Sequence, residues 1–359
     1  MSGNFNIIMT VAHTPTLGNW STPVPMNGST SASYMTSITV DASDKFMAVG
    51  YAPTAGYYPQ SAYSTDGINW STPAVMNSSV TAIYMQGVTV SPAGKFVAVG
   101  YGDSPGYPYA AYSTDGINWS TPAVMNGTTT QFIMIATTVN SAGKFVAVGS
   151  TRVGFPSVVP VAAYSTDGIN WTTPAVINGS LYYAGMTGVT VNSADKFVSV
   201  GYNLTNGYPI ASYSTNGTTW TTSYMNGSTT FARMLAVTVN SSGKFVSVGY
   251  DAGAKPVSAY STDGTSWTTP ARMSATTINI SPYGLAVNTA GKFVVVGYDY
   301  TNNLAVTSYS TDGITWSDFI RFNGSAAGET MLGIAVNASG LFAAVGEDNG
   351  YAVAAYSYS

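Results

Sequence analysis

Cysteine is absent from this chain of 359 residues, which contains only one histidine (His13) and two glutamates (Glu329 and Glu347). Without thiols the protein has no disulfide scaffold, no thiolate nucleophile and no cysteine ligand for a metal. One histidine and two glutamates leave few groups for acid–base chemistry or metal binding. We therefore expect no metal centre, no cofactor and no enzymatic activity.

Charge is scarce as well. The 11 basic and 15 acidic residues make up 7% of the chain, whereas about 25% is usual. A net charge of -4, with four arginines among the 11 basic residues, leaves no basic surface to neutralise phosphates, so we expect no nucleic-acid partner. Hydrophobic residues still make up 45% of the sequence, which is enough for a folded core.

The sequence also has no long hydrophobic run, so we expect no membrane insertion. The first ten residues carry no basic group before the short apolar stretch Ile7–Met9, and this is not the pattern of a secretory signal. A cytoplasmic protein, a trimmed mature form and a component of a virion all fit that observation. The composition favours an extracellular, cell-surface or virion location among them.

What the chain does contain is a repeat. Its seven tryptophans recur at spacings of 50, 49, 52, 49, 47 and 49 residues, at Trp20, Trp70, Trp119, Trp171, Trp220, Trp267 and Trp316. A second column reads Lys-Phe six times, beginning at Lys45, Lys95, Lys144, Lys196, Lys244 and Lys292, and its seventh member is Leu341-Phe342. Seven units of about 50 residues, with no linker between them, indicate a repeat architecture.

Each unit has the pattern of four short β-strands. In the second unit, segments rich in β-branched and aromatic residues alternate with turn signals such as Pro92–Gly94 and Asp115-Gly116. No segment of useful length has helical periodicity. The sequence therefore predicts an all-β, seven-bladed β-propeller with four antiparallel strands per blade, forming a single domain over residues 1–359.

The two ends predict how the ring closes. The C-terminal Ala354–Ser357 matches a third strand, and Gly18–Pro23 near the N-terminus matches the missing fourth. A blade built from both ends would protect two sheet edges. Residues 1–16 then form an N-terminal extension or a surplus strand.

A motif in the repeats resembles a known hairpin. The sequence Tyr-Ser-Thr-Asp-Gly-x-x-Trp occurs five times, and a sixth copy has Asn216 in place of Asp. It resembles a shortened Asp-box (BNR) hairpin of sialidase-like propellers and sortilin-type receptors. We interpret these residues as structural, with Asp accepting amide hydrogen bonds and Trp inserting between blades: Asp66, Asp115, Asp167, Asp263, Asp312, Trp70, Trp119, Trp171, Trp220, Trp267 and Trp316. We expect the lysine column, on the same face, to pair locally with these aspartates or to be solvated.

The resemblance also raises the alternative of an enzyme. Sialidases of this fold use three arginines, a Tyr/Glu pair and an acidic general acid. None of the four arginines here stands in a recognisable family setting. Glu347 with Asp348, or Glu329, could in principle supply the carboxylate pair of a glycoside hydrolase, and we rank that function below a non-catalytic one.

The loops predict where a ligand would bind. Loops between strands one and two and between strands three and four are nearly identical among the repeats, whereas those on the opposite face differ in sequence and length. Loops on a rigid frame often carry function, and the variable face is rich in aromatic residues. Our candidate ligand-binding residues are Tyr57, Tyr58, Tyr107, Tyr109, Arg152, Phe155, Tyr208, Arg233, Tyr300 and Tyr351. The alternative is that these rings only pack against neighbouring loops.

A methionine column at the start of the first strand is a further candidate. It is expected near the mouth of the central channel on the variable face, where adaptable side chains can line a site, but filling of the core is the favoured interpretation. The column consists of Met35, Met85, Met134, Met186, Met234 and Met331.

Three functions remain open at this point. The first is a non-catalytic binding module, directed to a glycan or a protein surface through several similar shallow sites. The second is a structural or surface-display component of a virion, sheath or cell surface, in which the chain assembles with itself. The third is a glycoside hydrolase.

Overall fold

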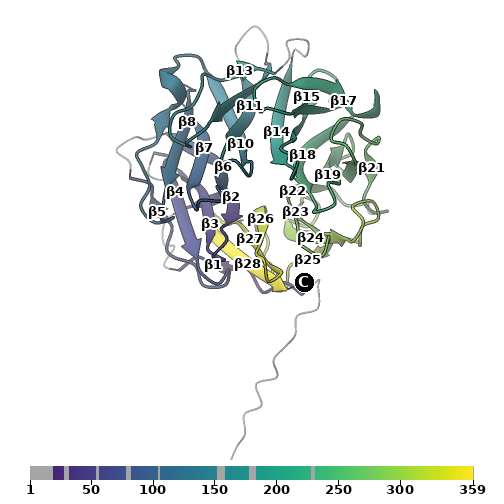
Figure 1. The fold of residues 1–359 in the computed structure, drawn as a ribbon. Helices are drawn as coiled ribbons and strands as arrows, with labels where there is room; N and C mark the ends of the chain where they lie inside the picture. The colour runs from purple at the N-terminus through teal and green to yellow at the C-terminus, as the bar shows by residue number, and fades with distance from the viewer. Residues whose placement is uncertain are drawn as a thin grey trace, which may run out of the picture.

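The computed structural model describes residues 19–358 apart from 28–31, 54–55, 78–81, 104–105, 152–157, 178–182, 228–230 and 276. Seven four-stranded antiparallel sheets stand around a central axis (Figure 1), which confirms the predicted all-β, seven-bladed propeller. No helix among the described residues is long and apolar enough to cross a lipid bilayer.

In blades 1 to 6 the four strands run outward from the axis in chain order, and in blade 7 the outermost strand comes from the N-terminal segment. The innermost strands are β2 (Tyr34–Val40), β6 (Ile83–Val90), β10 (Phe132–Val139), β14 (Ala184–Val191), β18 (Ala232–Val239), β22 (Ile280–Val287) and β26 (Thr330–Val336). The second strands are β3 (Phe46–Ala52), β7 (Phe96–Gly102), β11 (Phe145–Thr151), β15 (Phe197–Asn203), β19 (Phe245–Asp251), β23 (Phe293–Asp299) and β27 (Leu341–Asp348). Blades 1 to 7 are numbered in this order.

The outer strands are shorter. The third strands are β4 (Tyr58–Ser64), β8 (Pro108–Ser113), β12 (Pro160–Ser165), β16 (Pro209–Ser214), β20 (Pro256–Ser261), β24 (Leu304–Ser310) and β28 (Tyr351–Tyr358). The fourth strands are β5 (Ala74–Val75), β9 (Ala123–Val124), β13 (Ala175–Val176), β17 (Thr221–Tyr224), β21 (Ala271–Arg272), β25 (Ile320–Arg321) and β1 (Val24–Pro25). Two 3-10 turns, η2 (Met125–Gly127) and η3 (Met225–Gly227), follow β9 and β17.

Blade 7 is completed by the N-terminal segment, as predicted. β1 pairs antiparallel with β28, with Val24 opposite Ala354. The amide of Ser21 donates to the carbonyl of Tyr356 at 2.8 Å, and the amide of Met26 donates to that of Ala352 at 2.9 Å. Figure 1 shows the purple N-terminal strand beside the yellow β28. The paired residues follow directly after the predicted Gly18–Pro23, and the extension 1–16 lies outside the described residues.

The core is divided among the seven blade interfaces, each of which holds its own apolar cluster. At the interface of blades 1 and 2, Trp119 and Phe96 of blade 2 pack with Met47 and Val49 of blade 1. The tryptophan of each repeat thus lies between two blades, where it excludes water from both.

The methionine column belongs to these clusters. Met35 and Met85 are fully buried in the interfaces, and so are the other members of the column. The favoured interpretation as core filling holds, and the methionines do not line the central cavity. Their thioethers fill irregular gaps where the blades converge.

Candidate functional site

The Asp-box turn is a closed network of hydrogen bonds. In blade 2 one carboxylate oxygen of Asp115 accepts the amides of Ile117 and Asn118, both at 2.8 Å, and the other accepts the side-chain amide of Asn118 at 2.7 Å. Hydrogen bonds from the backbone amide of Ile117, and from the side-chain and backbone amides of Asn118, hold the pKa of Asp115 well below its ordinary value. Asp115 therefore braces its own turn.

The lysine column links neighbouring blades instead of pairing with the carboxylates. Nζ of Lys95 in blade 2 donates to the backbone carbonyl of Asp167 in blade 3 at 2.8 Å, and the same ammonium lies 5.6 Å from the ring centre of Tyr112 in its own blade. Lys196 bonds the carbonyl of Asp263 in the same way at 2.7 Å. The predicted pairing of these lysines with the aspartate carboxylates is therefore wrong. Amide groups of the turn already donate to the carboxylates, so the ammonium groups donate to the backbone carbonyls instead.

A cavity of about 550 Å³ runs along the axis, enclosed by the seven innermost strands. Every innermost strand has an irregular register at one position, as between Met35 and Ser37 in β2. Such a β-bulge leaves one residue without a partner in the ladder. The seven bulge residues line the cavity: Thr36, Gln86, Ile135, Thr187, Leu235, Tyr283 and Leu332.

Small residues follow each bulge, because the blades approach closely at the axis. A Cβ on Gly87 would lie 3.0 Å from Cα of Ala136 in the next blade. The seven positions are Ser37, Gly87, Ala136, Gly188, Ala236, Gly284 and Gly333.

At the variable face, pairs of residues opposite one another on the first and second strands form a ring around the cavity mouth. We call this ring, together with Tyr57, Phe231, Tyr283 and Tyr300 beside it, the tyrosine rim. The pairs, in blade order, are Tyr34 with Tyr51, Tyr84 with Tyr101, Ile133 with Ser150, Gly185 with Tyr202, Arg233 with Tyr250, Ser281 with Tyr298, and Thr330 with Glu347.

Blades 1 and 2 contribute one continuous aromatic arc to the rim. Tyr34 stacks on Tyr51 with ring centres 5.4 Å apart, and Tyr84 stacks on Tyr101 at 5.2 Å. Tyr51 meets Tyr84 edge to face at 4.8 Å, and Tyr57 lies 4.9 Å from Tyr84. Tyr51 also lines the cavity, so this arc joins the loop surface to the channel.

A second arc, which contains a cation, is formed by blades 4 and 5. The guanidinium of Arg233 lies 4.7 Å from the ring centre of Tyr202 and 5.4 Å from that of Phe231. One terminal nitrogen of Arg233 donates to the hydroxyl of Tyr250 at 3.4 Å. The Nε atom of Arg233 is buried without a hydrogen-bond partner among the described residues.

Blade 6 continues this second arc. The hydroxyls of Tyr283 and Tyr300 share a hydrogen bond of 2.5 Å, and Tyr298 meets Tyr300 edge to face at 4.8 Å. Between the two arcs, Ser150 of blade 3 faces Gly185 of blade 4, where a Cβ would be 3.6 Å from that of Ser150. The rim is therefore aromatic on two sides, and at the junction of blades 3 and 4 it consists of small residues.

The rim tyrosines that have a raised pKa are neutral hydrogen-bonding groups. Burial, together with neighbouring tyrosines and acidic groups, raises the pKa of both Tyr51 and Tyr84 to about 12. Burial and the bond to Tyr300 raise the pKa of Tyr283. At neutral pH each ring thus presents an apolar face and a hydroxyl that can donate or accept.

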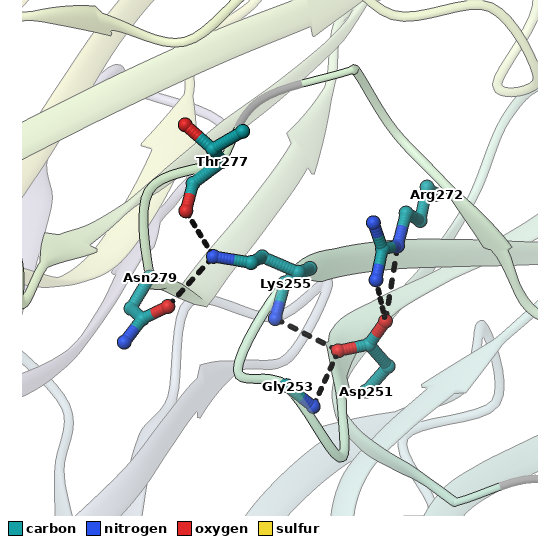
Figure 2. Close-up of polar contacts among 6 residues, drawn as sticks. All are labelled: Asp251, Gly253, Lys255, Arg272, Thr277 and Asn279. Atoms are coloured by element: carbon teal, nitrogen blue, oxygen red, sulfur yellow. Dashed lines mark hydrogen bonds and ion pairs between the residues drawn. The ribbon is translucent and has the colours of Figure 1, made fainter.

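Three charged residues of blade 5 near this face, Asp251, Lys255 and Arg272, are engaged within the protein (Figure 2). Asp251 accepts the amides of Gly253 and Lys255, at 2.8 and 3.0 Å, and pairs with Arg272 at 3.1 Å. The ammonium of Lys255 bonds the carbonyl of Thr277 and the side chain of Asn279 in front of blade 6. These contacts tie the loop of blade 5 to the entry of blade 6.

The residues selected from the sequence separate into two groups. Tyr57, Arg233 and Tyr300 belong to the rim. Tyr58, Tyr107, Tyr208 and Tyr351 share one column at the start of the third strand, one strand further from the axis, and Tyr109 lies within the third strand. Arg152 and Phe155 lie outside the described residues.

Both glutamates lie in blade 7, where they stabilise short turns. Glu329 is 3% exposed and accepts the amide of Ala326 at 3.1 Å, and Glu347 accepts the amide of Gly350 at 3.1 Å. Burial raises the pKa of each glutamate. No group of three His, Cys, Asp or Glu residues that could hold a metal ion occurs in the described part of the chain.

Sequence reasoning missed most of the rim. Its second-strand members directly follow a glycine that occurs in every repeat, as in Gly50-Tyr51 and Gly100-Tyr101. The signal was present: the position holds Tyr five times, then Ser150 and Glu347 in the remaining blades. The predicted aromatic site residues came from the variable loops, whereas this column belongs to the strands.

Comparison with solved structures identifies the architecture. The BP39L lectin from Burkholderia pseudomallei superimposes with a TM-score of 0.69 at 11% identity, over 92% of this chain and 96% of the lectin. The fold is that of lectin and sialidase propellers. The Hadza microbial sialidase Hz136 has a TM-score of 0.57 at 12% identity, over 91% of this chain and 66% of its own.

A third propeller of this kind is an ulvan lyase from a polysaccharide lyase family, with a TM-score of 0.53 at 11% identity, over 94% of this chain and 96% of the lyase. Neither a protein-family model nor a curated protein sequence matches the chain. Identities of this size establish the shared propeller fold. The chemistry of the site must be argued from its residues.

Proposed function

We propose that this propeller binds carbohydrate at the tyrosine rim and does so without catalysing a reaction. The observation that carries the proposal is the concentration of tyrosine rings around the mouth of a cavity of about 550 Å³. Concave sites with aromatic walls and a few polar groups are the usual form of small-molecule sites.

The chemistry of the rim suits sugars. A pyranose ring has apolar C–H faces and a periphery of hydroxyls, so it can stack on a tyrosine while hydrogen-bonding to phenol groups and backbone amides. Tyr57 and Tyr300 are 38% and 51% exposed, which leaves ring surface for such contacts. The differing rim pairs of the seven blades favour one asymmetric site over several similar ones.

The comparisons support this choice. A lectin is among the similar structures, and the other two compared are a sialidase and a polysaccharide lyase. We favour binding over catalysis because Glu329 and Glu347 are engaged in turns. Arg233 is the single arginine among the rim residues, where a sialidase site would need three.

A glycan array followed by calorimetric titration of the best glycan tests the proposal. Tyr300→Ala and Tyr51→Ala should each weaken binding at least about tenfold, the loss expected when a stacked ring and its hydrogen bond are removed. Tyr351→Ala is the matched control, because Tyr351 is 43% exposed but lies on the third strand. The Tyr351→Ala variant should bind the glycan as tightly as the wild-type protein does.

Two results would contradict the proposal. Folded protein that retains no glycan on the array would remove the carbohydrate ligand. Release of shortened or unsaturated products from a bound glycan, followed by chromatography, would show an enzyme instead of a binding module.

A further inference from the structure

The rim is built from contacts across blade junctions. At each junction the second strand of one blade packs against the first strand of the next. Tyr51 of blade 1 meets Tyr84 of blade 2 at 4.8 Å between ring centres. Tyr202 of blade 4 meets the guanidinium of Arg233 of blade 5 at 4.7 Å. The same geometry makes Glu347 of blade 7 the neighbour of Tyr34 of blade 1.

The charge of this carboxylate acts on tyrosines of both neighbouring blades, Tyr34 of blade 1 and Tyr298 of blade 6. Burial and the charge of Glu347 both raise the pKa of Tyr34, and Tyr34 in turn stacks on Tyr51 at 5.4 Å. On the blade 6 side, the same charge contributes, after burial and Tyr300, to the raised pKa of Tyr298. Glu347 is half-buried, and its strand β27 packs against β2 of blade 1, the strand that carries Tyr34.

In the described part of the chain, Glu347 has no cationic ion-pair partner. Within the described residues no lysine or arginine forms an ion pair with Glu347, whose hydrogen bond comes from the amide of Gly350 at 3.1 Å. Asp348, its sequence neighbour, adds a second negative charge and thereby helps to raise the pKa of Glu347, after burial. Partly buried carboxylates normally gain a positively charged partner.

Elsewhere in the molecule, tyrosine rings are occupied by positively charged side chains. At the junction of blades 4 and 5, Arg233 supplies a cation to the rings of Tyr202 and Phe231. On the opposite face, Lys95 and its equivalents lie over tyrosine rings, 4.3 Å away at the closest. The scaffold repeatedly places cations on tyrosine faces, and the junction of blades 7 and 1 has the rings and an anion without the cation.

We propose that the site formed by Glu347, Tyr34, Tyr51 and Tyr298 binds a positively charged amino group of the ligand. This inference rests on the proposed function, and it names the ligand class as a glycan with unacetylated amino sugars. The ammonium would gain a charge-assisted hydrogen bond to the carboxylate and attraction to the electron-rich ring faces. Because Tyr51 also lines the cavity, the sugar that carries the amine would sit at the channel mouth.

The test is a calorimetric titration of the full chain with two probes, a β-1,4-linked glucosamine tetramer and its N-acetylated counterpart. We expect the glucosamine tetramer to bind at least about tenfold more tightly, since acetylation removes the charge. Its affinity should fall as salt is raised from about 0.05 to 0.5 M, and that of the acetylated tetramer should not.

Glu347→Gln should abolish the preference for the free amine, with both tetramers binding alike. Glu329→Gln is the control, because it makes the same change to a glutamate of the same blade that lies outside the site. It should keep the preference. Circular dichroism of each variant establishes that the propeller is intact.

The outcomes are distinguishable from failure of the proposed function. Equal affinity of the wild-type protein for both tetramers, or a preference that survives in Glu347→Gln, overturns the inference while glycan binding stands. If neither tetramer binds but a neutral glycan is retained on the array, the inference also falls and the proposed function survives. Absence of all glycan binding overturns both.

Discussion

The indole Nε1–H of Trp316 in blade 6 donates a hydrogen bond of 3.1 Å to the hydroxyl of Ser258 in blade 5. The equivalent nitrogens of Trp70, Trp119, Trp171, Trp220 and Trp267 are buried with no hydrogen-bond partner among the residues that the structure describes. An unpaired buried N–H costs about 1–3 kcal/mol. The interface of blades 5 and 6 therefore satisfies a buried indole N–H, whereas five other interfaces bear the cost of leaving it unpaired.

This difference predicts a stabilising substitution. Ala211 holds the position of Ser258 in blade 4 and packs in the same cluster as Trp267. Ala211→Ser should raise the free energy of unfolding by about 1 kcal/mol because the new hydroxyl can accept the indole N–H. Urea titration measures it, and the gain should vanish in a Trp267→Phe background. A gain that persists there would show that another contact is responsible.

Substituting alanine for each of two glycines distinguishes the cost of backbone strain from the cost of a steric clash. Gly168 has φ +74° and a Cβ there would lie 2.7 Å from Cγ2 of Val97, whereas Gly143 has φ +81° with no atom within 4 Å. Gly143→Ala should cost about 1 kcal/mol from the left-handed conformation alone. Gly168→Ala should cost about 1–3 kcal/mol more because of the clash. Equal losses in thermal unfolding would contradict the packing argument.

The Asp-box carboxylates predict a loss of stability in acid. The pKa of Asp115 is held low by the amide of Ile117 and by Asn118, so its contribution is present above the ordinary value of about 3.9 and is lost as pH falls through the folded value. Asp115→Asn should be less stable at pH 7, and the difference should shrink steadily below pH 4. Blade 4 shows that Asn is tolerated, since Asn216 accepts the amides of Thr218 and Thr219 at 2.8 and 2.9 Å. A difference that is independent of pH would refute the linkage.

For Glu329 we expect the opposite change of stability with pH. Its pKa is raised by burial, so the ionised form weakens the fold, and the wild-type protein gains stability as pH falls from neutral toward the ordinary value of about 4.3. Glu329→Gln keeps an acceptor for the amide of Ala326 and should be more stable than the wild type at pH 7. Denaturant titrations at pH 7 and 5 should show the advantage shrinking at the lower pH. An advantage that grows in acid would reverse the assignment.

The lysine column is expected to contribute little individually. Lys196 bonds the carbonyl of Asp263 at 2.7 Å and lies 5.5 Å from the ring centre of Tyr213. Because the ammonium is exposed, Lys196→Leu should lower the free energy of unfolding by less than about 1 kcal/mol. Leucine is already present at this position in blade 7, as Leu341, where it is buried. Urea unfolding decides, and a loss of several kcal/mol would mean that the link between blades acts cooperatively.

The repeats made the fold accessible from sequence, whereas the site was only partly accessible. The strand pattern around Trp119 and the match of the two chain ends were enough to predict four strands per blade and the closure of blade 7 by the N-terminal segment, although the paired strand is Val24–Pro25 and not the predicted Gly18–Pro23. The variable face was also selected, with Tyr57, Arg233 and Tyr300 among its residues. Tyr51 was not, because it belongs to a regular strand whose side-chain directions depend on a bulge in the partner strand, and Glu347 was considered only as a carboxylate of a glycoside hydrolase.

By itself the sequence determined that seven nearly uncharged units form a ring of β-sheets, because strand periodicity, turn residues and repeat spacing are local properties of the chain. Only the tertiary structure decided which columns meet. Each blade brings its second-strand rim residue against the first strand of the next, and ring closure places Glu347 beside Tyr34 from the other end of the chain. A contact of that kind depends on the register of two sheets and the small residues that let blades converge, so the tyrosine rim emerges only when the ring is closed.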